Sequence, residues 1–161
     1  MPQWTLFEND FRVIDETLND LIERTSAVSV HLVDRSGQLI TSAGRVGDLD
    51  PTGFASLIAA EFTANAELAQ MLGDHGVEAV VSEGKSRSVY SCLLAERVIM
   101  ACVFDRRSTL GLVRFRANRA AHALDGVFRE LLEKVGLAEG IMVEPEFSRV
   151  ADQQVDALFG D

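Results

Sequence analysis

The chain has 161 residues, 47% of them apolar, so it is long enough to bury one sizeable hydrophobic core. Its formal net charge of −10 gives it no general attraction for nucleic acid or anionic lipid, and we expect neither as a partner. No apolar run approaches the roughly 20 residues that span a bilayer. The acidic start of the sequence lacks the basic and apolar blocks of a signal peptide. These features predict a cytoplasmic protein without membrane insertion.

The first predicted element is a helix that begins near Thr5, because Thr5 and Glu8 have the spacing of a capping box. Apolar residues then recur at alternating intervals of four and three, which makes one stripe: Phe7, Phe11, Ile14, Leu18, Leu21 and Ile22. Two strands follow, over 28–33 and 38–42, joined by a turn whose residues favour tight reversal of the chain.

A second helix is predicted over 51–72, with Asp50 as its N-cap and Gly73 just beyond its end. It is small or apolar around most of its circumference, which is typical of a helix covered on more than one side. We assign its bulky residues to the side that faces the core: Phe54, Leu57, Ile58, Phe62, Leu68, Ala69 and Leu72. A strip of small residues lies beside them: Ala55, Ala59, Ala60, Thr63, Ala64 and Ala66. This strip predicts either burial within the chain or a symmetric homodimer that uses the same patch on both subunits.

Three strands with short connections are predicted over 77–82, 88–94 and 97–104, and both faces of the last two are apolar. With a two-residue turn at Ala95-Glu96, Cys92 and Cys102 would point to opposite faces of the sheet, too far apart for a disulfide. A long final helix is predicted over 110–135, ending at Gly136.

The resulting element order is α-β-β-α-β-β-β-α, in the α+β class, with a mainly antiparallel sheet, one helix on one face and two on the other. The predicted domain spans 1–136, and 137–161 form a linker and a short amphipathic C-terminal segment. In that segment Val155, Leu158 and Phe159 fall at helical spacing and predict a face that folds on a partner, although the polar composition equally permits disorder.

Motifs that would indicate catalysis are weak. The fragment Gly84-Lys85-Ser86 matches the end of a phosphate-binding loop, but Ala79 stands where the first glycine is needed and strands flank the fragment, so we predict a hairpin turn. The three histidines, His31, His75 and His122, show no ligand spacing. We therefore predict no catalytic residue, no metal and no cofactor.

The arginine pair Arg106-Arg107 lies between the last strand and the last helix, which Ser108 or Thr109 can cap. An arginine supplied in trans to a GTPase accelerates hydrolysis by about 10³–10⁵-fold, which makes this pair a candidate for such a group. We favour a solvated joint between strand and helix, because arginine pairs are common in turns.

Several stretches together resemble the roadblock/LC7 family, and within it the bacterial MglB-type proteins: LVDRSGQLITSAG (32–44), ASLIAAEFTANAELAQMLG (55–73), SEGKSRSVY (82–90), RVIMACVFDRRSTLGLVRFR (97–116) and the terminal VDALFGD. The resemblance implies a five-stranded antiparallel sheet with helices on both faces and a homodimer joined through the middle helix and the third strand. It also implies a partner, a Ras-like small GTPase of the MglA type, whose GTP hydrolysis the dimer stimulates in cell polarity or motility. Proteins of this family reorder the GTPase's own catalytic groups and insert no arginine.

By the same resemblance, the residues expected to bind the GTPase are Ala60, Thr63, Ala64 and Glu67. Those expected at the dimer interface are Ala55, Ala59, Ala66 and Val80, and the C-terminal partner contact would be Val155, Leu158 and Phe159. Two alternatives stay open: a roadblock scaffold that tethers a GTPase or signalling complex without changing turnover, and a ligand-sensing domain. The second needs an internal pocket, and the large residues on both sheet faces argue against one.

Overall fold

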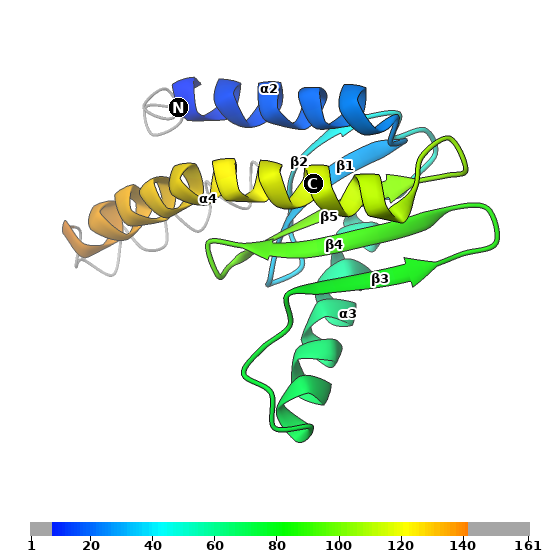
Figure 1. Cartoon of the computed structure of the whole chain (residues 1–161). Helices are drawn as coiled ribbons and strands as arrows, with labels where there is room; N and C mark the ends of the chain where they lie inside the picture. The colour runs from blue at the N-terminus through cyan, green and yellow to red at the C-terminus, as the bar shows by residue number, and fades with distance from the viewer. Residues whose placement is uncertain (1–7, 142–161) are drawn as a thin grey trace.

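The computed structural model describes the backbone of residues 8–141 and the side chains of residues 8–135. Within this range the chain forms three helices and five strands in the predicted order (Figure 1). Their bounds are α2 Glu8–Thr25, β1 Ser29–Asp34, β2 Leu39–Gly44, α3 Pro51–Met71, β3 Ala79–Glu83, β4 Ser88–Leu94, β5 Val98–Phe104 and α4 Leu110–Ile141. The proposed start of the first helix at Thr5, and the C-terminal residues Val155, Leu158 and Phe159, lie outside the described residues.

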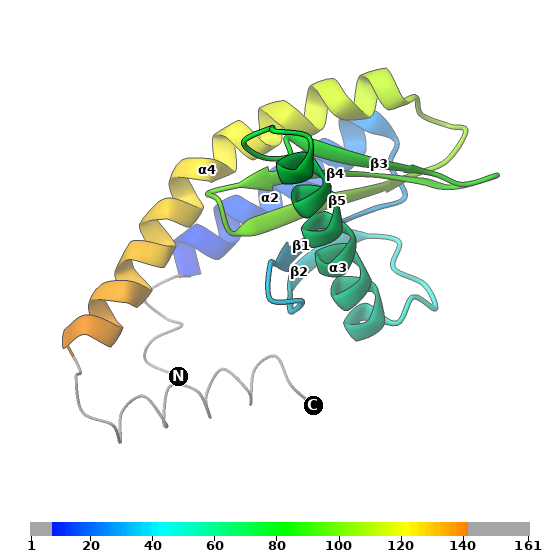
Figure 2. The same ribbon diagram turned by 90° about the horizontal axis from the view of Figure 1, so that it is seen from below.

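The five strands form one antiparallel sheet in the order β2-β1-β5-β4-β3. Helices α2 and α4 lie side by side on one face, and α3 crosses the other face (Figures 1 and 2). This confirms the predicted α+β architecture with helices on both faces of the sheet.

The larger core lies between the sheet and the pair of helices α2 and α4. The stripe predicted for the first helix supplies part of it, since Ile14, Leu18 and Leu21 are buried there. From α4, Val113 and Leu124 pack into the same core. The smaller core lies under α3 on the opposite face, where Val33, Ile99 and Ala101 of the sheet meet the helix.

The hairpin of β4 and β5 corrects one predicted register. Leu94 pairs with Val98, so the turn has three residues and not two. Ala95 and Glu96 both have positive φ there, at 51° and 59°. Because one added residue moves every β4 side chain to the other face, Cys92 lies on the same face as Cys102, against α2 and α4. Both thiols are free and buried.

The sequence predicts the start of α4 correctly but not its end. Thr109 caps α4 as expected, because its Oγ1 accepts a hydrogen bond from Leu112 N at 3.2 Å. The helix then continues through Gly136 to Ile141, so the predicted end at Gly136 is wrong. Among the described residues no helix is long and apolar enough to cross a bilayer.

Candidate functional site

Helix α3 turns a different face to the sheet from the one predicted. Its buried residues are Ala55, Ile58, Ala59 and Phe62, a run at intervals of three, one and three. The alanines therefore allow α3 to lie close on its own sheet. Ala55 is 0% and Ala59 5% exposed in the single chain, so their side chains pack against the chain's own sheet, and their place at a dimer interface stays a prediction.

The assignment of the bulky residues to the core is right for Ile58 and Phe62, which are buried, but three of the assigned leucines lie outside the core. Leu57, Leu68 and Leu72 are 72%, 55% and 85% exposed, and Met71 is 83% exposed. The C-terminal half of α3 extends past the edge strand β3, where no sheet lies beneath it (Figure 1). We call these four residues the apolar face of α3. Monomeric soluble proteins rarely expose large contiguous apolar patches, so this face indicates an interaction surface.

A groove of about 480 Å³ lies beside the apolar face, between α3 and the turn that joins β1 to β2. It is lined by Arg35, Ser36, Gly37, Ser56, Ala59, Ala60, Thr63, Ala64 and Glu67. All four residues predicted to bind a GTPase line it: Ala60, Thr63, Ala64 and Glu67. The structure thus brings the four together on one accessible side of the helix.

The turn that forms the opposite wall is held rigidly. The Asp34 carboxylate accepts hydrogen bonds from the backbone N of Ser36, at 2.9 Å, and from its hydroxyl. Gly37 has φ +99°, and a Cβ on it would stand 3.6 Å from Ser56 Cα. That distance is an ordinary contact, so the positive backbone angle, and not crowding, is what favours glycine at this position.

The charges at the groove come from opposite walls. Arg35 lies on the turn, where its Nη1 donates a hydrogen bond to the carbonyl of Glu96 at 3.3 Å. Glu67 lies on α3 and is exposed. Between these charges the wall of α3 consists mostly of small side chains, and a shallow surface of this kind suits a flat protein partner better than a small molecule.

The edge of the sheet nearest the apolar face belongs to β3. This strand pairs with β4 on one side and is the last strand of the sheet. An edge strand with unpaired backbone groups is a template for pairing with another chain. The other two predicted interface residues, Ala66 of α3 and Val80 of β3, are partly buried. No sequence signal marks the part of α3 that extends past β3.

The two sequence fragments considered for phosphate chemistry have local structural roles. Arg107 forms an ion pair with Asp105, with Nη2 and Oδ2 2.9 Å apart, which confirms the joint between strand and helix. The Gly84-Lys85-Ser86 fragment forms the β3–β4 hairpin turn, closed by a hydrogen bond of 3.0 Å from Gly84 N to Arg87 O. Because strands lie on both sides of Gly84-Lys85-Ser86, this fragment does not form the glycine-rich loop before a helix that cradles phosphate.

His31 is fully buried between the sheet and the first turns of α3. Its Nδ1 lies 2.8 Å from Ser42 Oγ and its Nε2 lies 2.9 Å from Ser29 Oγ. Burial lowers the pKa of His31 to about 4, so the ring is neutral near pH 7. Among the described residues no three His, Cys, Asp or Glu side chains gather as metal ligands. His31 is a hydrogen-bonded core residue.

Residues 13–104 match the model of the Roadblock/LC7 domain, more than half of the chain. The chain belongs to the roadblock/LC7 family. No curated protein matches the sequence significantly.

Among solved structures the chain is similar to MglB proteins. It is 36% identical to MglB from Myxococcus xanthus, with a TM-score of 0.70 over 73% of this chain and 95% of that chain. It is 25% identical to the gliding protein MglB from Thermus thermophilus, with a TM-score of 0.71 over 75% and 92% of the two chains. A third structure, described as MglB with tetrameric arrangement, is 26% identical with a TM-score of 0.71 over 75% and 91%. The fold and these relatives fit a regulatory protein better than an enzyme.

Proposed function

We propose that this protein is a homodimer that binds a Ras-like small GTPase of the MglA type and stimulates its GTP hydrolysis. The observation that carries the proposal is the groove of α3, in which Ala60, Thr63, Ala64 and Glu67 lie together and open to a partner. The similarity to MglB proteins supports the same assignment.

The dimer would form through the apolar face of α3 and the edge of β3. At about 100° per residue, the apolar face and the groove adjoin and partly overlap on α3, since Met71 lies about 20° from Ala60 and Leu57 about 20° from Ala64. Leu68 and Leu72 lie about a quarter turn or more from Ala60 and Glu67. Two α3 helices that pack through these two leucines would leave that side of each groove accessible beside the junction. The pair would present a wider surface to a GTPase than one chain can.

Stimulation would not use a catalytic group from this chain. On the α3 wall the groove offers small side chains and one exposed acid, and Arg35 on the opposite wall donates a hydrogen bond to the carbonyl of Glu96. Arg107 is tied to Asp105 in the joint before α4. We infer that the dimer binds the hydrolysing arrangement of the GTPase switch regions more tightly than the resting arrangement, because such differential binding lowers the barrier.

Single-turnover GTP hydrolysis by an MglA-type GTPase encoded in the same genome, with and without this protein, tests the proposal. Accelerated hydrolysis at saturating protein supports it. Binding without acceleration would favour a tethering scaffold, and absence of binding would refute the assigned partner.

A further inference from the structure

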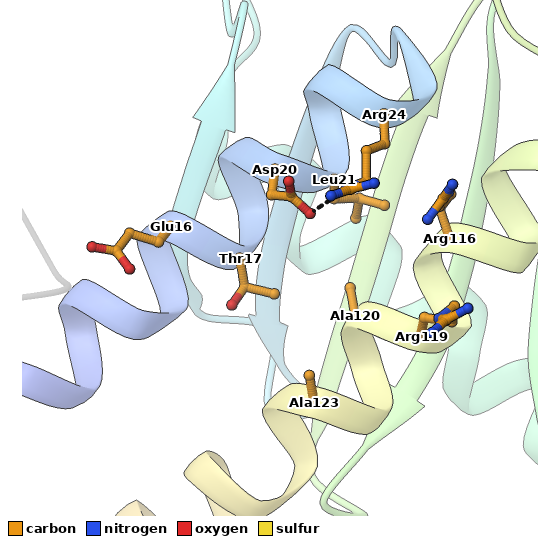
Figure 3. Close-up of a pocket in the computed structure, with 9 residues that line it drawn as sticks. All are labelled: Glu16, Thr17, Asp20, Leu21, Arg24, Arg116, Arg119, Ala120 and Ala123. Carbon is orange, nitrogen blue, oxygen red and sulfur yellow. Dashed lines mark hydrogen bonds and ion pairs between the residues drawn. The ribbon is translucent and has the colours of Figure 1, made fainter.

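A second groove, of about 510 Å³, lies on the opposite side of the molecule, between α2 and α4 (Figure 3). Its apolar lining consists of Leu21 from α2 with Ala120 and Ala123 from α4. Three arginines stand toward one end of the groove, Arg24 on α2 and Arg116 and Arg119 on α4 (Figure 3). This arginine cluster is notable in a chain with a net charge of −10.

The arginine cluster is incompletely satisfied by the described part of the chain. Arg24 pairs with Asp20, with Nε and Oδ2 2.8 Å apart. In contrast, Nε of Arg116 is buried and has no hydrogen-bond partner within residues 8–135. A buried donor without an acceptor costs free energy, and an incoming carboxylate would satisfy it. Glu16, the remaining acid of this groove, lies away from the arginines (Figure 3).

An exposed aromatic ring adjoins the same arginines. Phe115 is 52% exposed, and the guanidinium groups of Arg116 and Arg119 each lie 5.5 Å from the centre of its ring. The end of the groove therefore combines positive charge with apolar surface. A ligand that carries carboxylates beside large apolar side chains matches this combination.

The chain itself contains such a segment. Residues 142–161 carry five carboxylates and one arginine, a net charge of −4. Their last part, 150–161, has three aspartates and no basic residue. The apolar residues Val155, Leu158 and Phe159 lie between these aspartates in the sequence.

The connecting length is sufficient for this segment to reach the cluster. From Ile141 back to Arg116 along α4 is about 38 Å at 1.5 Å per residue. Asp156 lies fifteen residues beyond Ile141, and extended chain of that length spans up to about 50 Å.

We propose that the groove between α2 and α4 is the docking site of residues 150–161 of the same chain, with their aspartates at Arg24, Arg116 and Arg119 and their apolar side chains over Leu21, Ala120 and Phe115. The docking does not depend on the proposed function. If the same apolar residues also contact a partner, as the sequence predicts, that contact requires the segment to leave the groove.

A spin label on the full-length chain tests the docking. Because Cys92 and Cys102 are buried and burial raises the pKa of Cys92 to about 12, a cysteine introduced as Gln153→Cys can be labelled selectively. We expect the label to broaden the amide NMR signals of Asp20, Leu21 and Ala123, and this broadening to weaken at about 1 M salt, where the screening length is about 3 Å.

Two variants separate docking from a change in the fold. Arg116→Glu with Arg119→Glu should abolish the broadening, whereas the matched control Arg45→Glu with Arg106→Glu, two exposed arginines outside the groove, should retain it. Asp156→Lys with Asp161→Lys should abolish the broadening while the described domain remains unaltered. The proposal is overturned if either the double arginine variant of the groove or the double aspartate variant of the segment shows undiminished broadening. It is also overturned if the labelled protein without these changes shows no broadening at the groove. A last sample mixes chains that carry the spin label with isotope-enriched chains that carry no spin label. Broadening that appears only in such mixed samples arises between chains, and it overturns docking within one chain.

Discussion

The ring of His31 lies 4.6 Å from the ring of Phe54, centre to centre, and the two planes are tilted by 54°. This contact joins the middle of the sheet to the first turn of α3, the helix that carries the candidate site. The hydroxyls of Ser29 and Ser42 occupy both ring nitrogens. A neutral imidazole uses one nitrogen as donor and the other as acceptor, and both roles are filled.

We predict that stability falls as pH decreases from about 6.5 to about 4, because of His31. The pKa of its imidazole is about 4 in the folded chain and 6.5 for the unperturbed group. Between these values the unfolded chain binds the additional proton, so the contribution is fully present above pH 6.5 and is lost as pH falls through this window. The slope approaches about 1.4 kcal/mol per pH unit for one group. Urea unfolding at several pH values measures it.

His31→Gln provides the comparison that isolates this group, because an amide can bond both serines without titrating. We expect the variant to be less stable at pH 7 but to lose less stability on acidification. Equal pH slopes in both proteins would show that other groups, such as carboxylates, cause the acid sensitivity.

The sequence predicts the architecture well because periodic patterns decide which elements form. The stripe of α2 and the alternation of the strands place Ile14, Leu18 and Val30 in one core, as the structure shows. The length of a turn is less visible in sequence, since Ala95-Glu96 and Ala95-Glu96-Arg97 are both acceptable turns. That single residue decides the face on which Cys92 lies.

The candidate site could be predicted in part. The resemblance to the roadblock/LC7 family assigns Ala60 and Ala64 to a partner-binding surface, and in the structure both line the groove. Periodicity cannot tell which of two apolar stripes faces inward when both are present on one helix. The overhang of α3 depends on the position of the helix across the sheet, which local pattern does not encode. The sequence pattern therefore assigns Leu57 to the wrong side because two stripes compete, and it misses the exposure of Leu68 because of the overhang.

We predict that Ala59→Leu destabilises the protein, whereas Ala60→Leu does not. Ala59 is buried against the sheet, where larger side chains force the packing apart at a cost of about 1–3 kcal/mol. Ala60 is exposed on the adjoining side of the same helix. The measurement is the free energy of unfolding from denaturant titration. Similar loss in both variants would contradict the observed orientation of α3.

We predict that Leu68→Asp disrupts the homodimer and leaves the monomer folded. The Leu68 side chain is 55% exposed in the single chain and lies on the apolar face of α3, where a buried carboxylate without a partner would oppose association. Sedimentation equilibrium measures the molar mass. Val13→Asp on α2, where Val13 is 43% exposed, is the matched control and should remain dimeric. A wild-type chain that stays monomeric at high concentration would refute the interface outright.

Finally, we predict that Ala64→Arg abolishes stimulation of GTP hydrolysis without altering the fold. Ala64 is exposed in the groove and lies about 20° around α3 from Leu57 of the apolar face, so a long charged side chain would keep a flat partner surface away and remain solvated in the free protein. Glu130→Arg introduces an arginine at an exposed position of α4, on the other face of the sheet and outside both grooves, and should stimulate hydrolysis like the wild type. The decisive measurements are GTPase affinity and single-turnover rate for both variants, with circular dichroism as the check on folding. Normal stimulation by Ala64→Arg would remove the groove of α3 as the GTPase-binding surface, whatever the behaviour of the dimer.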